Sequence, residues 1–144
     1  MEAEKSNGCP LHGGGAAAQG LVGRLLVEVV GSRHVYGSEA PAGPLDVWLV
    51  DDRGATVHVT TGSDGCLIVE ESEPHTGYDM GGSGRVTVGA IGDETPFADH
   101  LGESILAVRE EHEPNTGRVA LEITFPGGRV RCESWAEDLR LTLM

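Results

Sequence analysis

The stretch Leu45-Asp46-Val47-Trp48-Leu49-Val50, followed by the turn Asp51-Asp52-Arg53-Gly54, decides the fold class. Apolar side chains occupy the odd positions 45, 47 and 49, and this alternation predicts a β-strand with one buried and one wetter face. Gly54 supplies the positive φ that a hairpin turn needs. Another alternating segment, 56–61, follows at once, so the whole stretch predicts a β-hairpin.

Similar alternating segments continue in both directions, separated by turn residues, which is typical of all-β proteins. Outward from the hairpin we expect strands at 25–30, 66–71, 85–90, 105–110, 118–125, 129–133 and 139–143. Helix is expected only as short turns near 95–101, where Thr95-Pro96 forms a capped start, and near 134–138, where Ser134-Trp135-Ala136-Glu137 matches a capping box. The sequence therefore predicts an all-β, β-dominated fold with one or two short helical turns.

The chain also resembles itself. The internal alignment pairs Val57 with Val130, Val59 with Cys132, Gly54 with Gly127, Cys66 with Leu139, Ile68 with Leu141, Val47 with Leu121, Leu49 with Ile123, and the segment 23–29 with 102–108. One such unit alone would leave a sheet face exposed, whereas two units can bury their faces against each other. We therefore expect two similar β-meander units, 21–71 and 100–143, packed together and joined by a connector, 72–99, within a single β-rich domain, 20–144.

The first 19 residues have few bulky apolar side chains and are expected to form a disordered tail. They show no basic start followed by an apolar run, and no segment approaches the roughly 20 apolar residues that cross a bilayer. A cytoplasmic location is therefore the default expectation.

Charge restricts the possible partners. The chain carries 23 acidic and 10 basic residues, a formal net charge of −13. A field of this sign repels polyanions, so we expect no nucleic acid and no anionic membrane as partner. A basic protein is the better candidate, although such a charge can also serve solubility alone.

Two acidic runs and one tryptophan are the candidate binding residues. Glu70, Glu71, Glu73 and Asp79 form the densest acidic patch, and Glu110, Glu111 and Glu113 form a second. If these loops share one end of the sheets, they make an acidic surface suited to a basic partner; the alternative is a solvated rim. Trp48 lies opposite the apolar face of its strand, so it is either an exposed interface anchor or covered on both faces of a central strand.

The sequence offers no motif for catalysis, a metal or a cofactor. We expect no metal and no cofactor, and the absence of a catalytic motif favours a non-enzymatic protein, although catalytic residues can also assemble from distant positions. Cys9-Pro10-Leu11-His12 has the spacing of half a zinc site, but no second pair completes it. Phosphate-binding and nucleophile-elbow motifs are absent, and the six histidines are scattered. The third cysteine makes the count odd, which argues against a disulfide framework, and Cys66 and Cys132 are expected to be small buried apolar residues.

The last third of the chain carries a weakly specific family resemblance. The lead-in 92–108, the turn Asn115-Thr116-Gly117 and the strands at 121–125 and 139–143 resemble a group of small bacterial proteins classed as a domain of unknown function. The chain departs from that pattern in lacking an aromatic residue after the asparagine turn. In size, charge and β content it is also similar to immunity proteins that neutralise toxins. The resemblance implies a small β-rich protein and no particular activity.

Three hypotheses for function remain open. The first is a non-enzymatic, immunity-like module that binds a basic protein through its acidic loops. The second is a small-ligand binder or enzyme with a site between the two units, which a deep pocket with convergent polar groups would support. The third is a structural or assembly subunit.

Overall fold

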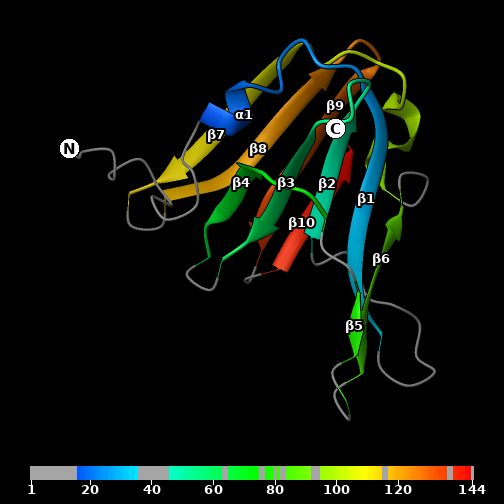
Figure 1. The fold of residues 1–144 in the computed structure, drawn as a ribbon. Helices are drawn as coiled ribbons and strands as arrows, with labels where there is room; N and C mark the ends of the chain where they lie inside the picture. The colour runs from blue at the N-terminus through cyan, green and yellow to red at the C-terminus, as the bar shows by residue number, and fades with distance from the viewer. Residues whose placement is uncertain are drawn as a thin grey trace.

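The computed structural model describes residues 16–35, 46–62, 65–74, 77–79, 81, 84–91, 95–114, 117–135 and 138–143. Within these residues the strands form two antiparallel sheets, a six-stranded one in the order β4-β3-β2-β1-β6-β5 and a four-stranded one in the order β10-β9-β8-β7 (Figure 1). The elements are α1 (Ala16–Gln19), β1 (Leu26–Val35), β2 (Asp46–Asp51), β3 (Thr56–Thr61), β4 (Leu67–Glu71), β5 (Tyr78–Asp79), β6 (Arg85–Ala90), η5 (Pro96–His100), β7 (Ala107–Glu113), β8 (Gly117–Phe125), β9 (Gly128–Trp135) and β10 (Asp138–Leu143).

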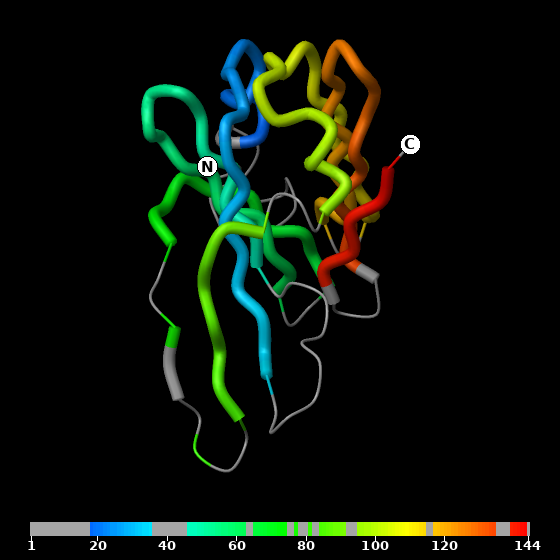
Figure 2. The backbone as a smooth tube through the Cα atoms, turned by 90° about the vertical axis from the view of Figure 1, so that its right-hand side faces the viewer, coloured from blue at the N-terminus to red at the C-terminus, as the bar shows by residue number. Residues whose placement is uncertain are grey.

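The two sheets face each other across one apolar core. Figure 2 shows the strands of the first sheet on one side and β8, β9 and β10 on the other. Val47 and Leu49 from the first sheet and Leu121 and Ile123 from the second belong to the same buried cluster. The all-β prediction is therefore confirmed. No helix in the described part of the chain is long and apolar enough to cross a bilayer.

The two units have the same strand order, as the internal alignment predicts. Successive strands pair from β1 to β4 and again from β7 to β10. In the first unit Val59 lies opposite Val47, and in the second Cys132 lies opposite Leu121. The connector is part of this architecture, since its strand β6 pairs with β1 and extends the first sheet.

The alignment is wrong by one residue in the last strand of each unit. Val59 lies opposite Val69, whereas Cys132 lies opposite Leu141. Leu141 therefore corresponds to Val69 and not to Ile68, and Leu139 corresponds to Leu67 and not to Cys66. A one-residue shift moves every side chain to the other face, and Cys66 and Ile68 accordingly form a small buried cluster apart from the main core.

Two local predictions also need correction. The expected tail 1–19 is structured at its end, because Ala16–Gln19 form α1 and Ala18 is fully buried in the core; residues 1–15 lie outside the described residues. The helical turn expected near 134–138 is wrong, since Ser134 pairs with Leu139 within β9 and β10. By contrast, the turn near 95–101 is confirmed as η5, where the Thr95 hydroxyl accepts a hydrogen bond from the Phe97 amide.

The segments that lead into the two units cross each other in an antiparallel bridge between Leu25 and Ser104. Four backbone hydrogen bonds surround the bridge as two matched pairs. In the first pair, Gly23 N donates to Ile105 O (2.8 Å) and Gly102 N donates to Leu26 O (2.6 Å). In the second pair, Leu26 N donates to Glu103 O (3.0 Å) and Ile105 N donates to Arg24 O (2.8 Å). The crossing thus has an approximate two-fold axis that exchanges the segments 23–29 and 102–108.

Alanine at either crossing glycine is expected to lower the free energy of unfolding by about 1–2 kcal/mol. Gly23 and Gly102 have φ of 91° and 88°, a region that side-chain-bearing residues rarely adopt. A Cβ at either position meets no atom within 4 Å, so the cost is backbone strain alone. Denaturant unfolding of Gly23→Ala and Gly102→Ala measures it, and clearly unequal losses would contradict the two-fold relation.

Candidate functional site

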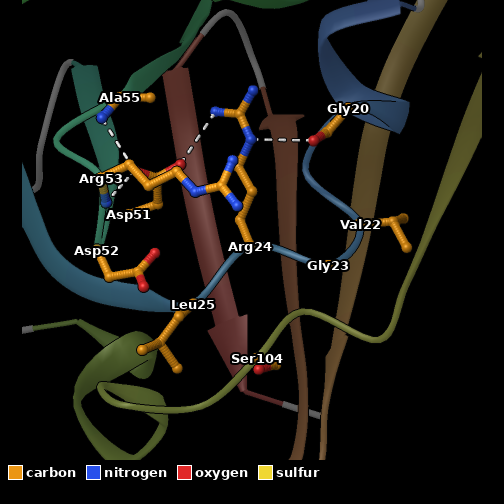
Figure 3. A pocket seen from close by; sticks show the side chains of 10 residues that line it. All are labelled: Gly20, Val22, Gly23, Arg24, Leu25, Asp51, Asp52, Arg53, Ala55 and Ser104. Atoms are coloured by element: carbon orange, nitrogen blue, oxygen red, sulfur yellow. Dashed lines mark hydrogen bonds and ion pairs between the residues drawn. The ribbon is translucent and has the colours of Figure 1, made fainter.

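A pocket of about 660 Å³ lies beside the crossing, where the first unit meets the lead-in of the second. Its walls come from the segment before β1, from the turn between β2 and β3, and from Ser104 (Figure 3). The lining residues are Gly20, Val22, Gly23, Arg24, Leu25, Asp51, Asp52, Arg53, Ala55 and Ser104. The pocket therefore combines residues that are far apart in the sequence.

Asp51 holds the β2–β3 turn in shape. Its Oδ1 accepts hydrogen bonds at 2.9 Å from the amides of Arg53 and Ala55, as the dashed lines in Figure 3 show. The Asp52 amide donates to Leu25 O at 3.1 Å, which ties the turn to the crossing. These bonds fix where the side chains of Asp52 and Arg53 project.

Arg24 is held within the pocket wall by its neighbours. Its Nε donates to Gly20 O at 3.0 Å and its Nη2 to Glu71 Oε2 at 3.1 Å, while Nη1 lies 3.7 Å from Asp51 Oδ2. Two carboxylates therefore balance this guanidinium. Asp52 and Arg53 are exposed, and no described side chain forms an ion pair with the Asp52 carboxylate.

Trp48 is buried, with 1% of its surface exposed, so the covered-strand alternative is right and the exposed-anchor alternative is wrong. Its ring stacks on His58, with centroids 4.6 Å apart and an angle of 8° between the rings. Trp48 points away from the core between the two sheets, but because it is buried it offers no surface to a partner.

The acidic run in the first unit is partly paired inside the protein. Glu71 bonds Arg24, and Glu70 Oε2 lies 3.8 Å from His58 Nδ1. Glu73 is exposed after the end of β4. Asp79 lies in β5, and its side chain lies outside the described part of the structure.

The acidic run in the second unit is divided between the two faces of β7. Glu110 faces inward, where it accepts hydrogen bonds from Arg118 Nε (2.8 Å) and Gln19 Nε2 (2.9 Å). Glu111 faces outward and accepts from both terminal nitrogens of Arg131, a contact that lowers the pKa of this carboxyl. Glu113 is exposed.

Helix α1 contacts both β4 and β7, so residues 70–73 and 110–113 lie along one edge of the two sheets (Figure 1). Asp79 does not lie on this edge, because β5 and β4 are at opposite ends of the first sheet, so the expected patch of Glu70, Glu71, Glu73 and Asp79 is wrong in this respect. The charge along this edge is nevertheless much reduced, because Glu71, Glu110 and Glu111 each bond an arginine. A continuous acidic surface from these residues is therefore less favoured than the sequence indicates.

Sequence reasoning missed a polar network on the outer face of the first sheet. Asp46 Oδ2 accepts from Ser32 Oγ at 2.6 Å, and Asp46 Oδ1 lies 2.8 Å from His58 Nε2. Burial raises the pKa of Asp46, but hydrogen bonds from His58, Ser32 and Thr60 outweigh it and lower the pKa to about 2. The Asp46 carboxylate lies between the Ser32 hydroxyl and the His58 imidazole. In a catalytic triad the histidine contacts the serine hydroxyl directly, so this network does not have the geometry of an activated serine nucleophile.

Cys66 and Cys132 are both buried, as the sequence predicts, but they differ in their bonding. Cys132 is free and buried, and burial raises the pKa of its thiol to about 12, so it is unreactive. Cys66 is disulfide-bonded, contrary to the sequence-based expectation, and its partner lies outside the described residues. The Cys9–His12 pair also lies outside them, and no group of three or more potential metal ligands occurs in the described segments.

No protein-family model, curated protein or solved structure matches this chain.

Proposed function

We propose that the protein is a non-enzymatic binding module whose partner protein inserts a basic side chain into the pocket at the crossing. The observation that carries this proposal is Asp52, an exposed carboxylate on a fixed turn at a pocket wall, with no described side chain paired to it. A lysine or arginine of a partner would supply the missing cation. Such a charge-assisted hydrogen bond contributes about 1.5–3 kcal/mol.

The local charges favour a cation over an anion. Arg24 is already balanced by Asp51 and Glu71, which leaves Asp52 and Arg53 as the exposed charges of the pocket. Around them the whole chain carries −13, a field that attracts basic proteins and speeds their association. Arg53 can turn toward solvent or pair with a carboxylate next to the incoming basic residue.

The pocket gives little support to an enzymatic role. Ser104 is the hydroxyl among the lining residues, and no described histidine or carboxylate lies in hydrogen-bond contact with it. An immunity-like role, with a basic toxin as partner, is one form of the proposal. A cytoplasmic location also remains a proposal, and the disulfide at Cys66 speaks against it because cytosolic thiols are kept reduced.

Affinity capture at low salt with Asp52→Asn tests the proposal. The tagged protein is incubated with lysate of its source organism, washed with rising salt, and the eluted proteins are identified by mass. We expect one basic protein to be released by salt from the wild type and about tenfold less of it from Asp52→Asn, the effect of losing one charged hydrogen bond.

Asp99→Asn is the matched control, because Asp99 is exposed, lies outside the pocket and undergoes the same chemical change. This variant is expected to capture as much partner as the wild type. Equal losses in the two variants would assign the effect to overall charge, and full capture by Asp52→Asn would exclude the pocket as the partner's site.

The pocket volume specifically favours a second candidate, the small-ligand binder. Ligand pockets commonly measure about 300–1,000 Å³, and this one falls within that range. A small polar ligand that carries both a cationic and an anionic group would pair with Asp52 and Arg53 together. It would raise the melting temperature of the purified wild type but not of Asp52→Asn, and no protein would be captured.

A further inference from the structure

The disulfide at Cys66 identifies its partner by elimination. The chain contains three cysteines, Cys9, Cys66 and Cys132. Cys66 is disulfide-bonded, whereas Cys132 is a free thiol, fully buried on β9. Within one chain, Cys9 is therefore the cysteine that remains for the bond. Cys9 itself lies outside the described residues, and its assignment follows from this count alone.

The chain is long enough for this pairing. Cys66 directly precedes β4, and α1, which begins at Ala16, contacts β4. Ala16 is seven positions after Cys9, and an extended chain of that length reaches up to about 23 Å. Strand β4 has five residues and measures about 17 Å. A bond from Cys9 to Cys66 is therefore compatible with the observed packing of α1 on the strand.

The turn before β4 holds Cys66 in place. Gly62 N donates to Cys66 O at 2.9 Å, and Gly65 N donates to Gly62 O at 3.0 Å. The Cys66 side chain is fully buried and packs with Ile68, apart from the main core. A disulfide at this position therefore fastens its partner segment to a well-anchored point beside the edge strand of the first sheet.

The two segments that the bond would join meet again at the pocket wall. Helix α1 is followed directly by Gly20, whose carbonyl oxygen accepts from Arg24 Nε at 3.0 Å (Figure 3). Strand β4 ends at Glu71, whose Oε2 accepts from Arg24 Nη2 at 3.1 Å. Gly20 and Arg24 both line the pocket. The Arg24 guanidinium therefore bridges the far ends of the two elements that Cys9 and Cys66 precede.

We propose that Cys9 and Cys66 form a redox-dependent clasp, a disulfide that joins the chain before α1 to the start of β4 and thereby fixes the pocket wall that Arg24 completes. With the bond intact, the two elements are linked covalently before their starts and through Arg24 at their ends. Reduction leaves α1 attached by its packing and by the Arg24 bonds alone. The clasp does not rest on the proposed function, because it holds the pocket wall whether or not a partner binds there.

Thiol–disulfide exchange closes and opens the clasp. Closing it takes two protons and two electrons from the two thiols, and an oxidised disulfide carrier accepts them as it becomes two thiols. Dithiothreitol, a dithiol, reverses the reaction and becomes a cyclic disulfide. Cytosolic thiols are kept reduced. The pocket wall is therefore fixed in an oxidising compartment and looser in a reducing one.

Thiol titration and non-reducing peptide mapping test the pairing in the full-length chain, purified in air without reductant. From the three cysteines we expect one titratable thiol in the denatured wild type, two in Cys9→Ser and three in the wild type after reduction. The map should contain one peptide that links Cys9 to Cys66. Three thiols before reduction, a link to Cys132, or a covalent dimer that dithiothreitol separates would each overturn the pairing.

Melting temperatures with and without dithiothreitol test what the clasp contributes. Reduction should lower the melting temperature of the wild type by about 5–10 °C, because a disulfide restricts the unfolded chain. Cys9→Ser should melt like the reduced wild type and should not respond to dithiothreitol. Cys132→Ala is the matched control, since it removes the free cysteine and should still show the full wild-type response. A fully reduced wild type that melts at the oxidised temperature overturns the proposal.

Amide chemical shifts of the nitrogen-15-labelled protein, oxidised and reduced, test the hold on the pocket wall. We expect changes at Gly20 and Arg24 as well as at Cys66, and the same shifts in untreated Cys9→Ser as in the reduced wild type. Asp99 on η5, outside the pocket, should not change. Changes confined to the residues next to the two cysteines would show a cross-link without influence on the wall and would overturn the clasp.

Discussion

Replacing Arg118 with methionine is expected to lower the free energy of unfolding by about 3–5 kcal/mol, because removing one partner of a buried ion pair leaves the other charge uncompensated. Arg118 is only 1% exposed. Its Nε donates to Glu110 Oε1 at 2.8 Å, and its Nη1 donates to Leu67 O at 3.0 Å. This side chain on β8 thereby links the second sheet to β4 of the first.

Urea denaturation of Arg118→Met beside Arg129→Met measures the effect. Arg129 is 53% exposed and lies 3.8 Å from Glu122, and exposed pairs of this kind contribute about 0–1 kcal/mol. The double variant Arg118→Met with Glu110→Gln should recover part of the lost stability, since no buried charge then remains unpaired. If Arg118→Met were no more destabilising than Arg129→Met, the link between the sheets would not contribute as described.

Replacing Phe97 with alanine is expected to cost about 3–5 kcal/mol of stability, the usual loss for truncating a fully buried aromatic side chain. Phe97 is completely buried in η5, with its ring edge-on to Phe125 at a centroid distance of 6.2 Å. Ala18 of α1, which precedes Gly23 by as many residues as Phe97 precedes Gly102, belongs to the same buried cluster. Phe97 is thus the large side chain that the segment before the second unit contributes to the core.

Thermal and denaturant unfolding of Phe97→Ala measure this loss. Leu101→Ala is a suitable comparison, because Leu101 follows η5 in the chain but is 38% exposed and should lose less than about 1 kcal/mol. A Phe97→Ala protein as stable as Leu101→Ala would show that η5 does not contribute to the core.

Much of the fold could be predicted from the alternation of apolar and polar side chains and from the turn residues between them. The ranges 56–61 and 85–90 coincide with β3 and β6, and the alignment of Val47 with Leu121 agrees with the observed register. The error at Cys66 and Ile68 arose because five residues separate Thr61 from its partner Leu67, whereas four separate the equivalent Ser134 from its partner Leu139. A turn of unknown length leaves the register undetermined, and register decides which face is buried.

The candidate site was less predictable because it depends on contacts between distant segments. Glu110 and Glu111 read as one acidic run, yet they face opposite sides of β7 and bond Arg118 and Arg131 on other strands. Alternation could have placed them on opposite faces, but their partners depend on cross-strand register. The pocket forms only where the segments 23–29 and 102–108 cross, and the sequence indicated this crossing only through the matched glycines Gly23 and Gly102.

Amide chemical-shift mapping of the nitrogen-15-labelled protein with trilysine, a minimal basic probe, tests the central claim most directly. The account predicts shifts concentrated at the pocket, in residues 20–25, 51–55 and at Ser104, that vanish in Asp52→Asn and persist in Asp99→Asn. Shifts confined to the acidic runs at 70–73 and 110–113, or pocket shifts that survive in Asp52→Asn, would contradict it.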